Sequence, residues 1–356
     1  MDERLSRTFQ LLRFPLAVWV VVIHSGWSEV LINGVTYGQG ELPVYRALSH
    51  FLCISAGGIV VPTFLFISGF LFFREGSFSR DAYAKKLKNR FRSLVIPYIL
   101  WNIGVLVFQF AYQTVLASRG YVFGSTRPVI EYDVIDFLRS FWDVKSGSPI
   151  CFQMWYVRDL IILTFISPVI WLLLTCFRKL GGLFLLIILF VVYLTCWPSF
   201  PPKMSSVLYF VWGAYFSIYH IKLIDGFSSV FTRCLWGYPI VLLVLSCTGN
   251  MHLLMASWPI GVLFLINFVY KFGRSDESLS DVRKYLAGIS FFLYCLHEPL
   301  LTILRKISYL LVKPATDFSF ILIWLVNVVM VVAIAIGLSM FLKKQMAWLW
   351  WLLNGR

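Results

Sequence analysis

The amino-acid sequence predicts an all-α fold: a polytopic membrane helix bundle of about ten transmembrane helices, with both termini cytoplasmic. Of the 356 residues, 59% are hydrophobic and only 13% are charged, which is too little polar surface to cover a soluble core of this size. The chain is divided into apolar runs, and Lys and Arg gather in alternate connections between them. Such a chain requires a bilayer as its solvent.

The apolar runs are long enough to cross the roughly 30 Å hydrocarbon core as helices. We expect ten spans, at roughly 10–31, 51–73, 93–117, 155–176, 181–198, 206–220, 232–248, 252–270, 286–304 and 319–341. The first run follows basic residues, as the apolar part of a signal peptide would. No small-residue cleavage pattern follows Ile23, so we expect this segment to be retained as a span.

The distribution of basic residues supports this topology. If the N-terminus is cytoplasmic, roughly two thirds of the Lys and Arg residues fall in internal segments, whereas the acidic residues divide almost evenly. The positive-inside rule describes this bias of Lys and Arg alone. Omitting one span would reverse the agreement over half of the chain. We therefore expect a multi-pass protein of the cell (inner) membrane.

Charge and cysteine usage exclude several other classes. The net charge of +14 does not indicate nucleic-acid binding, because the aromatic residues lie in the apolar runs rather than among the basic ones. The seven cysteines occur singly, so we expect no disulfide framework and no metal site. The longest external loops, 32–50 and 118–150, are too short for a separate soluble domain. Residues 1–356 are predicted to form a single membrane domain.

The first span carries an ionisable side chain at each end. Arg13 lies at its cytoplasmic entrance, and His24 follows eleven residues later, about 16 Å deeper at about 1.5 Å per residue. His24 then lies past the bilayer midplane, where an ionisable residue indicates a function. It could instead be hydrogen-bonded to a neighbouring helix. Because imidazole takes a proton at neutral pH, His24 could act as a general base or as an acyl acceptor.

The second span ends in PTFLFISGFLFFR, which contains adjacent Ser68 and Gly69. Gly69 permits close approach of a neighbouring helix or of a ligand chain, and helix packing is the simpler explanation.

The connection to the third span is strongly basic. It contains Arg74, Arg80, Lys85, Lys86, Lys88, Arg90 and Arg92 against Glu75 and Asp81. Anionic lipid head groups could hold this segment at the interface. The arginines could also bind a polyanionic cytosolic ligand, because guanidinium groups match phosphate oxygens. The two roles are compatible.

The fourth span opens with QMWYVRDLIIL, which places Trp155 and Tyr156 at the external interface, where aromatic residues are common. Arg158 and Asp159 follow inside an apolar helix. This pair could orient a polar acceptor, or its members could pair with each other.

The ninth span contains FFLYCLHEPLL, in which His297 and Glu298 precede Pro299 near the external end. His297 could be structural, since local hydrogen bonds satisfy the carbonyl groups that a proline frees. It could also support the chemistry or take part in it.

In this order the segments resemble the acyltransferase type 3 membrane family, over most of the chain. The matching landmarks are the Arg13 to His24 spacing, FISGFLF, RFRSLVIPYILW, MWYVRDL and ISFFLYCLHEPLL. The family attaches acyl groups from acyl-CoA to sugars and other hydroxyl-bearing envelope molecules. The resemblance implies a membrane O-acyltransferase with acetyl-CoA or another acyl-CoA as donor and no metal. It also implies an envelope sugar or glycan as acceptor, in contact with membrane lipids and not with nucleic acid.

The resemblance also assigns residues. It implies that His24 is catalytic, as general base or transient acyl carrier. For the donor we name Arg13, Ser68, Arg74, Arg90 and Arg92. For the acceptor we name Trp155, Tyr156, Arg158, Asp159, His297 and Glu298. Some relatives carry an acidic residue in a longer fourth-span motif, and others add an extracytoplasmic hydrolase-like domain. Here WYVRDL has Arg158 and Asp159 in place of the longer motif, so an acidic catalytic partner is not carried over. Without a hydrolase-like domain, we expect the membrane domain or a partner to handle the acceptor.

Two hypotheses from other functional classes compete with the acyltransferase. A transporter or flippase for an envelope precursor would line its path with His24, Arg158 and His297 and would not depend on acyl-CoA. For a non-catalytic scaffold, His24→Ala would change nothing measurable. The combined landmarks favour the acyltransferase.

Overall fold

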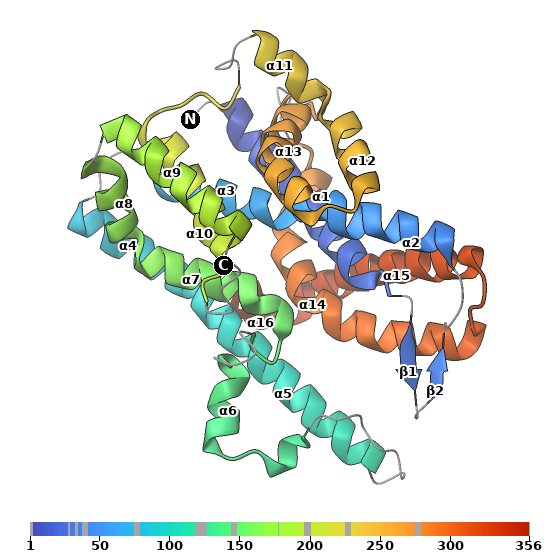
Figure 1. The fold of residues 1–356 in the computed structure, drawn as a ribbon. Helices are drawn as coiled ribbons and strands as arrows, with labels where there is room; N and C mark the ends of the chain where they lie inside the picture. The colour runs from blue at the N-terminus through green and yellow to red at the C-terminus, as the bar shows by residue number, and fades with distance from the viewer. Residues whose placement is uncertain are drawn as a thin grey trace.

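The computed structural model describes residues 3–27, 29–32, 35–37, 42–74, 79–117, 127–143, 148–176, 178–195, 201–224, 229–274 and 279–355. This part of the chain is helical apart from one short antiparallel ribbon, in which β1 (Val30–Ile32) pairs with β2 (Val35–Tyr37) (Figure 1). The prediction of an all-α polytopic helix bundle is confirmed.

Helices occupy all ten predicted spans, and seven helical segments in the described ranges are long and apolar enough to cross a membrane. These seven are α1 (Glu3–Ser25), the run from α2 (Pro43–Ser49) to α3 (Val60–Phe72), the run from α4 (Arg80–Arg90) into α5 (Ile96–Ala117), α9 (Arg178–Thr195), α13 (Met251–Phe272), α14 (Asp281–Val312) and α15 (Asp317–Gln345). The bent pair α7 (Trp155–Phe165) and α8 (Ser167–Cys176) can form an eighth. The shorter apolar helices are α10 (Met204–Ile218) and α12 (Tyr238–Thr248).

The remaining elements connect or cap these helices. They are η1 (His50–Ser55), η2 (Gly57–Ile59), η3 (Phe91–Val95), η4 (Val129–Glu131), α6 (Val134–Phe141), η5 (Phe152–Met154), α11 (Ser229–Trp236) and α16 (Ala347–Asn354).

Several predicted boundaries differ for local reasons. The fourth predicted span bends by 59° between α7 and α8, because Pro168 lacks an N–H and its ring crowds the preceding turn. Gly237 separates α11 from α12 in the seventh. The first helix starts at Glu3, which pairs with Arg7 one turn later at 2.6 Å. It ends at Ser25, earlier than predicted.

Helix α1 runs through the middle of the bundle and packs against α3, α13, α14 and α15 (Figure 1). It runs parallel to α14: Arg13 lines the same cavity as Gly288, and His24 lies beside His297 further along both helices. Arg13 and His24 are therefore each placed beside α14, near Gly288 and His297 respectively.

Helices α3 and α10 cross at close range because each has a glycine at the contact. A Cβ on Gly69 would lie 2.0 Å from the Phe210 carbonyl oxygen, and a Cβ on Gly213 would lie 2.0 Å from the Phe66 carbonyl oxygen. The packing role of Gly69 therefore follows from direct backbone approach. This crossing holds Ser68 at the edge of the cavity described below.

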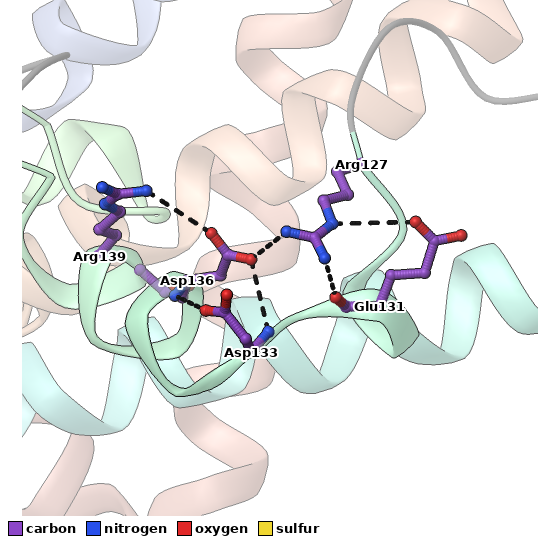
Figure 2. A network of polar contacts seen from close by, with 6 residues as sticks. Arg127, Glu131, Asp133, Asp136 and Arg139 are labelled. Carbon is purple, nitrogen blue, oxygen red and sulfur yellow. Dashed lines mark hydrogen bonds and ion pairs between the residues drawn. The ribbon is translucent and has the colours of Figure 1, made fainter.

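Outside the bundle, residues 127–143 form a polar network around the start of α6 (Figure 2). Arg127 is ion-paired with Asp136 and, at 3.8 Å, with Glu131, while Arg139 lies 3.8 Å from Asp136. Asp133 caps the helix by accepting a hydrogen bond from the Asp136 N–H at 2.7 Å, which lowers the pKa of its carboxyl. The described part of the second loop that the sequence predicts to be external is thus held by its own charges.

The α3–α10 crossing gives a test of the fold. We expect Gly69→Ala and Gly213→Ala each to destabilise the protein by about 1–3 kcal/mol or more, because the added methyl group must push the facing backbone away. Gly337→Ala in α15 is the matched control, since a Cβ there meets nothing within 4 Å. It should be neutral or stabilising by about 0.5–1 kcal/mol. Thermal melting of the detergent-solubilised variants measures the difference, and equal melting temperatures would contradict the crossing.

Candidate functional site

A cavity of about 290 Å³ lies among α1, α3, α4, η3, α7, α14 and α16. Two arginines, Arg13 and Arg90, are the charged residues among those that line it. Its polar lining also includes Ser68, Ser93, Tyr156, Ser290, Tyr294 and Asn354, and the remainder is largely apolar. A cationic mouth above an apolar interior suits a ligand with an anionic head and a slender neutral arm.

The two arginines approach this cavity from different elements. Arg13 is solvent-exposed and Arg90 is half-buried, and they lie within electrostatic range of each other and of Tyr156. The Ser68 side chain is within hydrogen-bonding reach of the Tyr156 hydroxyl. Two like charges beside one cavity attract an anion to the space between them.

Aromatic rings connect the cavity to His24. The Tyr156 and Tyr294 ring centroids, both in the cavity wall, lie 5.8 Å apart. Tyr294 is 5.9 Å from the His297 ring, which in turn is 5.2 Å from the His24 ring. The Tyr294 hydroxyl donates to the Gln153 carbonyl, which fixes the ring in place. Two successive rings, Tyr294 and His297, thus lie between the cavity and His24.

His297 is oriented by its neighbours. It is fully buried, and its Nδ1 lies beside the Tyr294 carbonyl oxygen, to which only an N–H can donate. In the neutral ring Nε2 is then the unprotonated nitrogen, and it has no hydrogen-bond partner among the described residues. His24, in the last turn of α1, lies between this ring and Phe152, whose ring centroid is 5.5 Å away.

On the far side of His24 lies a pair that the sequence analysis identified only in part. Arg305 is within electrostatic range of both His24 and Glu298, and its guanidinium lies 4.5 Å from the centre of the Trp27 ring. Glu298 is buried, and its Oε2 and the Arg305 Nη1 have no hydrogen-bond partners in the described ranges. Arg305 fell one residue outside the ninth predicted span. The sequence feature that could have identified Arg305 is its position seven residues after Glu298, which places the two side chains on the same face of a helix.

Other predicted donor residues lie elsewhere. Arg74 lines a separate cavity of about 420 Å³ together with His220 and Lys222. Arg92 is exposed and does not line the cavity of Arg13 and Arg90. The structure therefore brings together Arg13, Ser68 and Arg90 but not Arg74 and Arg92.

The Arg158–Asp159 pair has internal partners. Arg158 Nη2 and Asp159 Oδ1 are 2.9 Å apart, and both side chains are almost fully buried. Asp159 Oδ2 also accepts from the Lys203 N–H at 2.9 Å and from the Ser206 hydroxyl at 2.8 Å, which joins α7 to α10. Burial lowers the pKa of the Lys203 ammonium, which lies 3.8 Å from the centre of the Trp155 ring. These contacts favour internal pairing, and contact with an acceptor stays a prediction.

Within the described ranges, no three His, Cys, Asp or Glu side chains are grouped so that they could hold a metal ion.

Comparison with known proteins identifies relatives. The model of a family described as "Acyltransferase domain" matches residues 7–340. The succinoglycan biosynthesis protein ExoH of Rhizobium meliloti (strain 1021) is 28% identical over 325 residues, which cover 85% of this chain and 80% of the relative. No solved structure matches the chain.

The Arg158–Asp159 pair can be tested by replacing one member and then both. Asp159→Ala should destabilise the protein by about 3–5 kcal/mol, because it leaves the buried guanidinium without its carboxylate. The double variant Arg158→Met/Asp159→Leu should recover much of this loss, because apolar side chains of similar size often replace a buried ion pair at little cost. Melting temperatures of the purified variants give the comparison.

The same double variant separates the two interpretations of the pair. If it folds but loses transfer to the acceptor while still hydrolysing the donor, the pair contacts the acceptor and an exclusively structural role is excluded.

Proposed function

This chain belongs to the acyltransferase domain family and is a multi-pass membrane acyltransferase, and from this premise we propose that it moves an acyl group from cytosolic acyl-CoA to a hydroxyl of a cell-envelope glycan. The single observation that carries the proposal is the chain of ring contacts that leads from the Arg13–Arg90 cavity through Tyr294 and His297 to His24. It links a cavity with two arginines in its lining to an imidazole within the bundle.

The chemistry of the cavity supports an acyl-CoA donor, with acetyl-CoA as the expected one. The phosphate groups would pair with Arg13 and Arg90, since guanidinium groups bind phosphate oxygens in two-pronged fashion. A cavity of about 290 Å³ is too small for the whole donor. The nucleotide would therefore remain at the cytoplasmic mouth, while the pantetheine arm enters between Ser68, Tyr156 and Tyr294. We place this mouth on the cytoplasmic side of the inner membrane together with both termini, and we treat residues 1–356 as a single domain.

Two routes bring His24 into the reaction. As a general base, His24 takes the proton of the acceptor hydroxyl while the oxygen attacks the thioester carbonyl, and returns it to the departing thiolate. As a nucleophile, its ring nitrogen displaces the thiolate, and the acyl-imidazole then acylates the hydroxyl. Either route needs the thioester to pass the Tyr294 ring. Trapping of an acylated His24 by rapid quench and mass spectrometry separates them.

The groups beyond His24 support a glycan acceptor. Glu298 Oε2 can accept a hydrogen bond from one sugar hydroxyl, and Arg305 Nη1 can donate one to another, because neither has a partner among the described residues. His297 Nε2 supplies a further acceptor. The relative named for succinoglycan biosynthesis supports a polysaccharide product. The predicted contacts of Trp155 and Tyr156 belong to this proposal, although Tyr156 lines the donor cavity.

The proposed donor site predicts different losses of acetyl-CoA binding and hydrolysis in five variants. His24→Ala should slow acetyl-CoA hydrolysis without acceptor by about 10²–10⁴-fold, because proton transfer is lost, and leave the dissociation constant unchanged. Arg13→Ala and Arg90→Ala should weaken acetyl-CoA binding about tenfold or more, because each removes a charged hydrogen-bond donor. Arg74→Ala and Arg92→Ala, outside this cavity, should have smaller effects. Calorimetry and thiol-release kinetics measure both quantities.

A folded wild-type protein that binds no acyl-CoA would remove the donor proposal and leave the transporter or flippase as the better account. Equal losses in all four arginine variants would place the phosphates outside this cavity.

The proposed acceptor site predicts a loss of glycan transfer without a loss of acetyl-CoA binding. Glu298→Gln and Arg305→Met should lower transfer to a glycan about tenfold or more, while acetyl-CoA binding is unchanged, because each removes a hydrogen-bonding group beyond His24. Lys306→Met is the matched control: this cation neighbours Arg305 in sequence but lies over the Tyr112 ring. Membranes incubated with labelled acetyl-CoA report transfer. If Lys306→Met and Arg305→Met behave alike, Arg305 has no specific role.

A further inference from the structure

Helix α16 forms one wall of the donor cavity, although it lies beyond the residues 7–340 that the family model matches. It turns back into the bundle after α15, so that Trp350 is buried against Phe292 with ring centroids 5.2 Å apart. The Trp101 indole N–H donates to the Leu353 carbonyl at 3.1 Å, which holds the end of α16 against α5. An apolar segment of eight residues thus carries its last side chain to the cavity.

That side chain, Asn354, is only partly satisfied. It is 5% exposed, and its Nδ2 donates to the Gly288 carbonyl at 3.0 Å. Because this bond fixes the orientation of the amide, Oδ1 is the free end, and it has no hydrogen-bond partner among the described residues. Leaving a buried acceptor unpaired is costly, and such atoms in native proteins commonly await a ligand or water.

The position of Asn354 is also held by its neighbour. Gly355 has φ +67°, and a Cβ there would lie 2.4 Å from the Ser93 carbonyl oxygen. The chain after α16 therefore docks against η3, three positions from Arg90, at a place where only glycine fits without a shift. The amide oxygen is presented from a fixed backbone beside the cationic mouth.

We propose that Asn354 Oδ1 accepts a hydrogen bond from an amide N–H of the pantetheine arm of the donor. This inference rests on the proposed acyl-CoA donor and assigns it a further binding residue. The ionised phosphates and the thioester have no hydrogen to donate to an amide oxygen, whereas the arm carries two secondary amide N–H groups and one hydroxyl. N-methylation of the amides distinguishes these donors, because it removes the N–H groups and keeps the hydroxyl. With the phosphates at Arg13 and Arg90, the arm is the part of the donor that enters the cavity lined by Asn354.

The test compares ligands as well as variants. Asn354→Leu, which keeps the side-chain size, should weaken acetyl-CoA binding about tenfold and leave binding of adenosine 3′,5′-bisphosphate, the nucleotide end alone, unchanged. In acceptor-free hydrolysis it should raise KM and leave kcat within about twofold. Asn327→Leu is the matched control: this buried asparagine lies on α15 outside the cavity, and its Oδ1 accepts from the Ser308 hydroxyl at 2.9 Å. Its acetyl-CoA affinity should match wild type.

A second measurement needs no variant. Acetyl-CoA analogues in which one or the other amide nitrogen of the arm is methylated should include one that binds wild type about tenfold more weakly. That analogue should bind Asn354→Leu no more weakly than acetyl-CoA does. If wild type binds both analogues as tightly as acetyl-CoA, the inference is overturned even when Asn354→Leu fails to fold. Parallel loss of acetyl-CoA and bisphosphate binding would assign Asn354 to the nucleotide end and also overturn it. No binding of acetyl-CoA to folded wild type would instead overturn the proposed donor itself.

Discussion

The parallel packing of α1 against α14 is the contact on which the rest of the site depends. It places Arg13 level with Gly288 at one end and His24 against His297 at the other. Because both helices are buried along this seam, the separation between the two ends is fixed by helix geometry rather than by loops. The proposed transfer from a cytosolic donor to an acceptor on the other side of the membrane would need such a fixed separation.

The buried polar groups of the bundle are of two kinds. The Arg158–Asp159 pair and Ser206 satisfy one another and hold α7 to α10, as buried charges must in a membrane protein. By contrast, the buried polar atoms of His297, Glu298, Arg305 and Asn354 that have no partners in the described ranges lie close to His24 or to the cavity. A fold retains such groups at a cost, and a polar substrate offsets that cost when it binds.

Hydropathy and the distribution of Lys and Arg were enough to predict a helix at each of ten spans. The order of the matching sequence segments was enough to indicate the family. The bend before Pro168 was visible only as a proline inside an apolar run. Which arginine of the basic connection faces the cavity depends on how the run of α4 and η3 is rotated against α1, and periodicity does not fix that rotation. Arg305 and Asn354 were missed because their environments are made by α1 and η3, far away in the sequence.

The central claim is that the donor enters the Arg13–Arg90 cavity and brings its thioester to His24. A cryo-EM structure of the protein in lipid nanodiscs with a non-hydrolysable thioether analogue of acetyl-CoA tests it most directly. We expect phosphate density between Arg13 and Arg90, and the sulfur past Tyr294 within contact of the His24 ring. An analogue bound at the separate cavity of Arg74 and Lys222, with no path to His24, would contradict it.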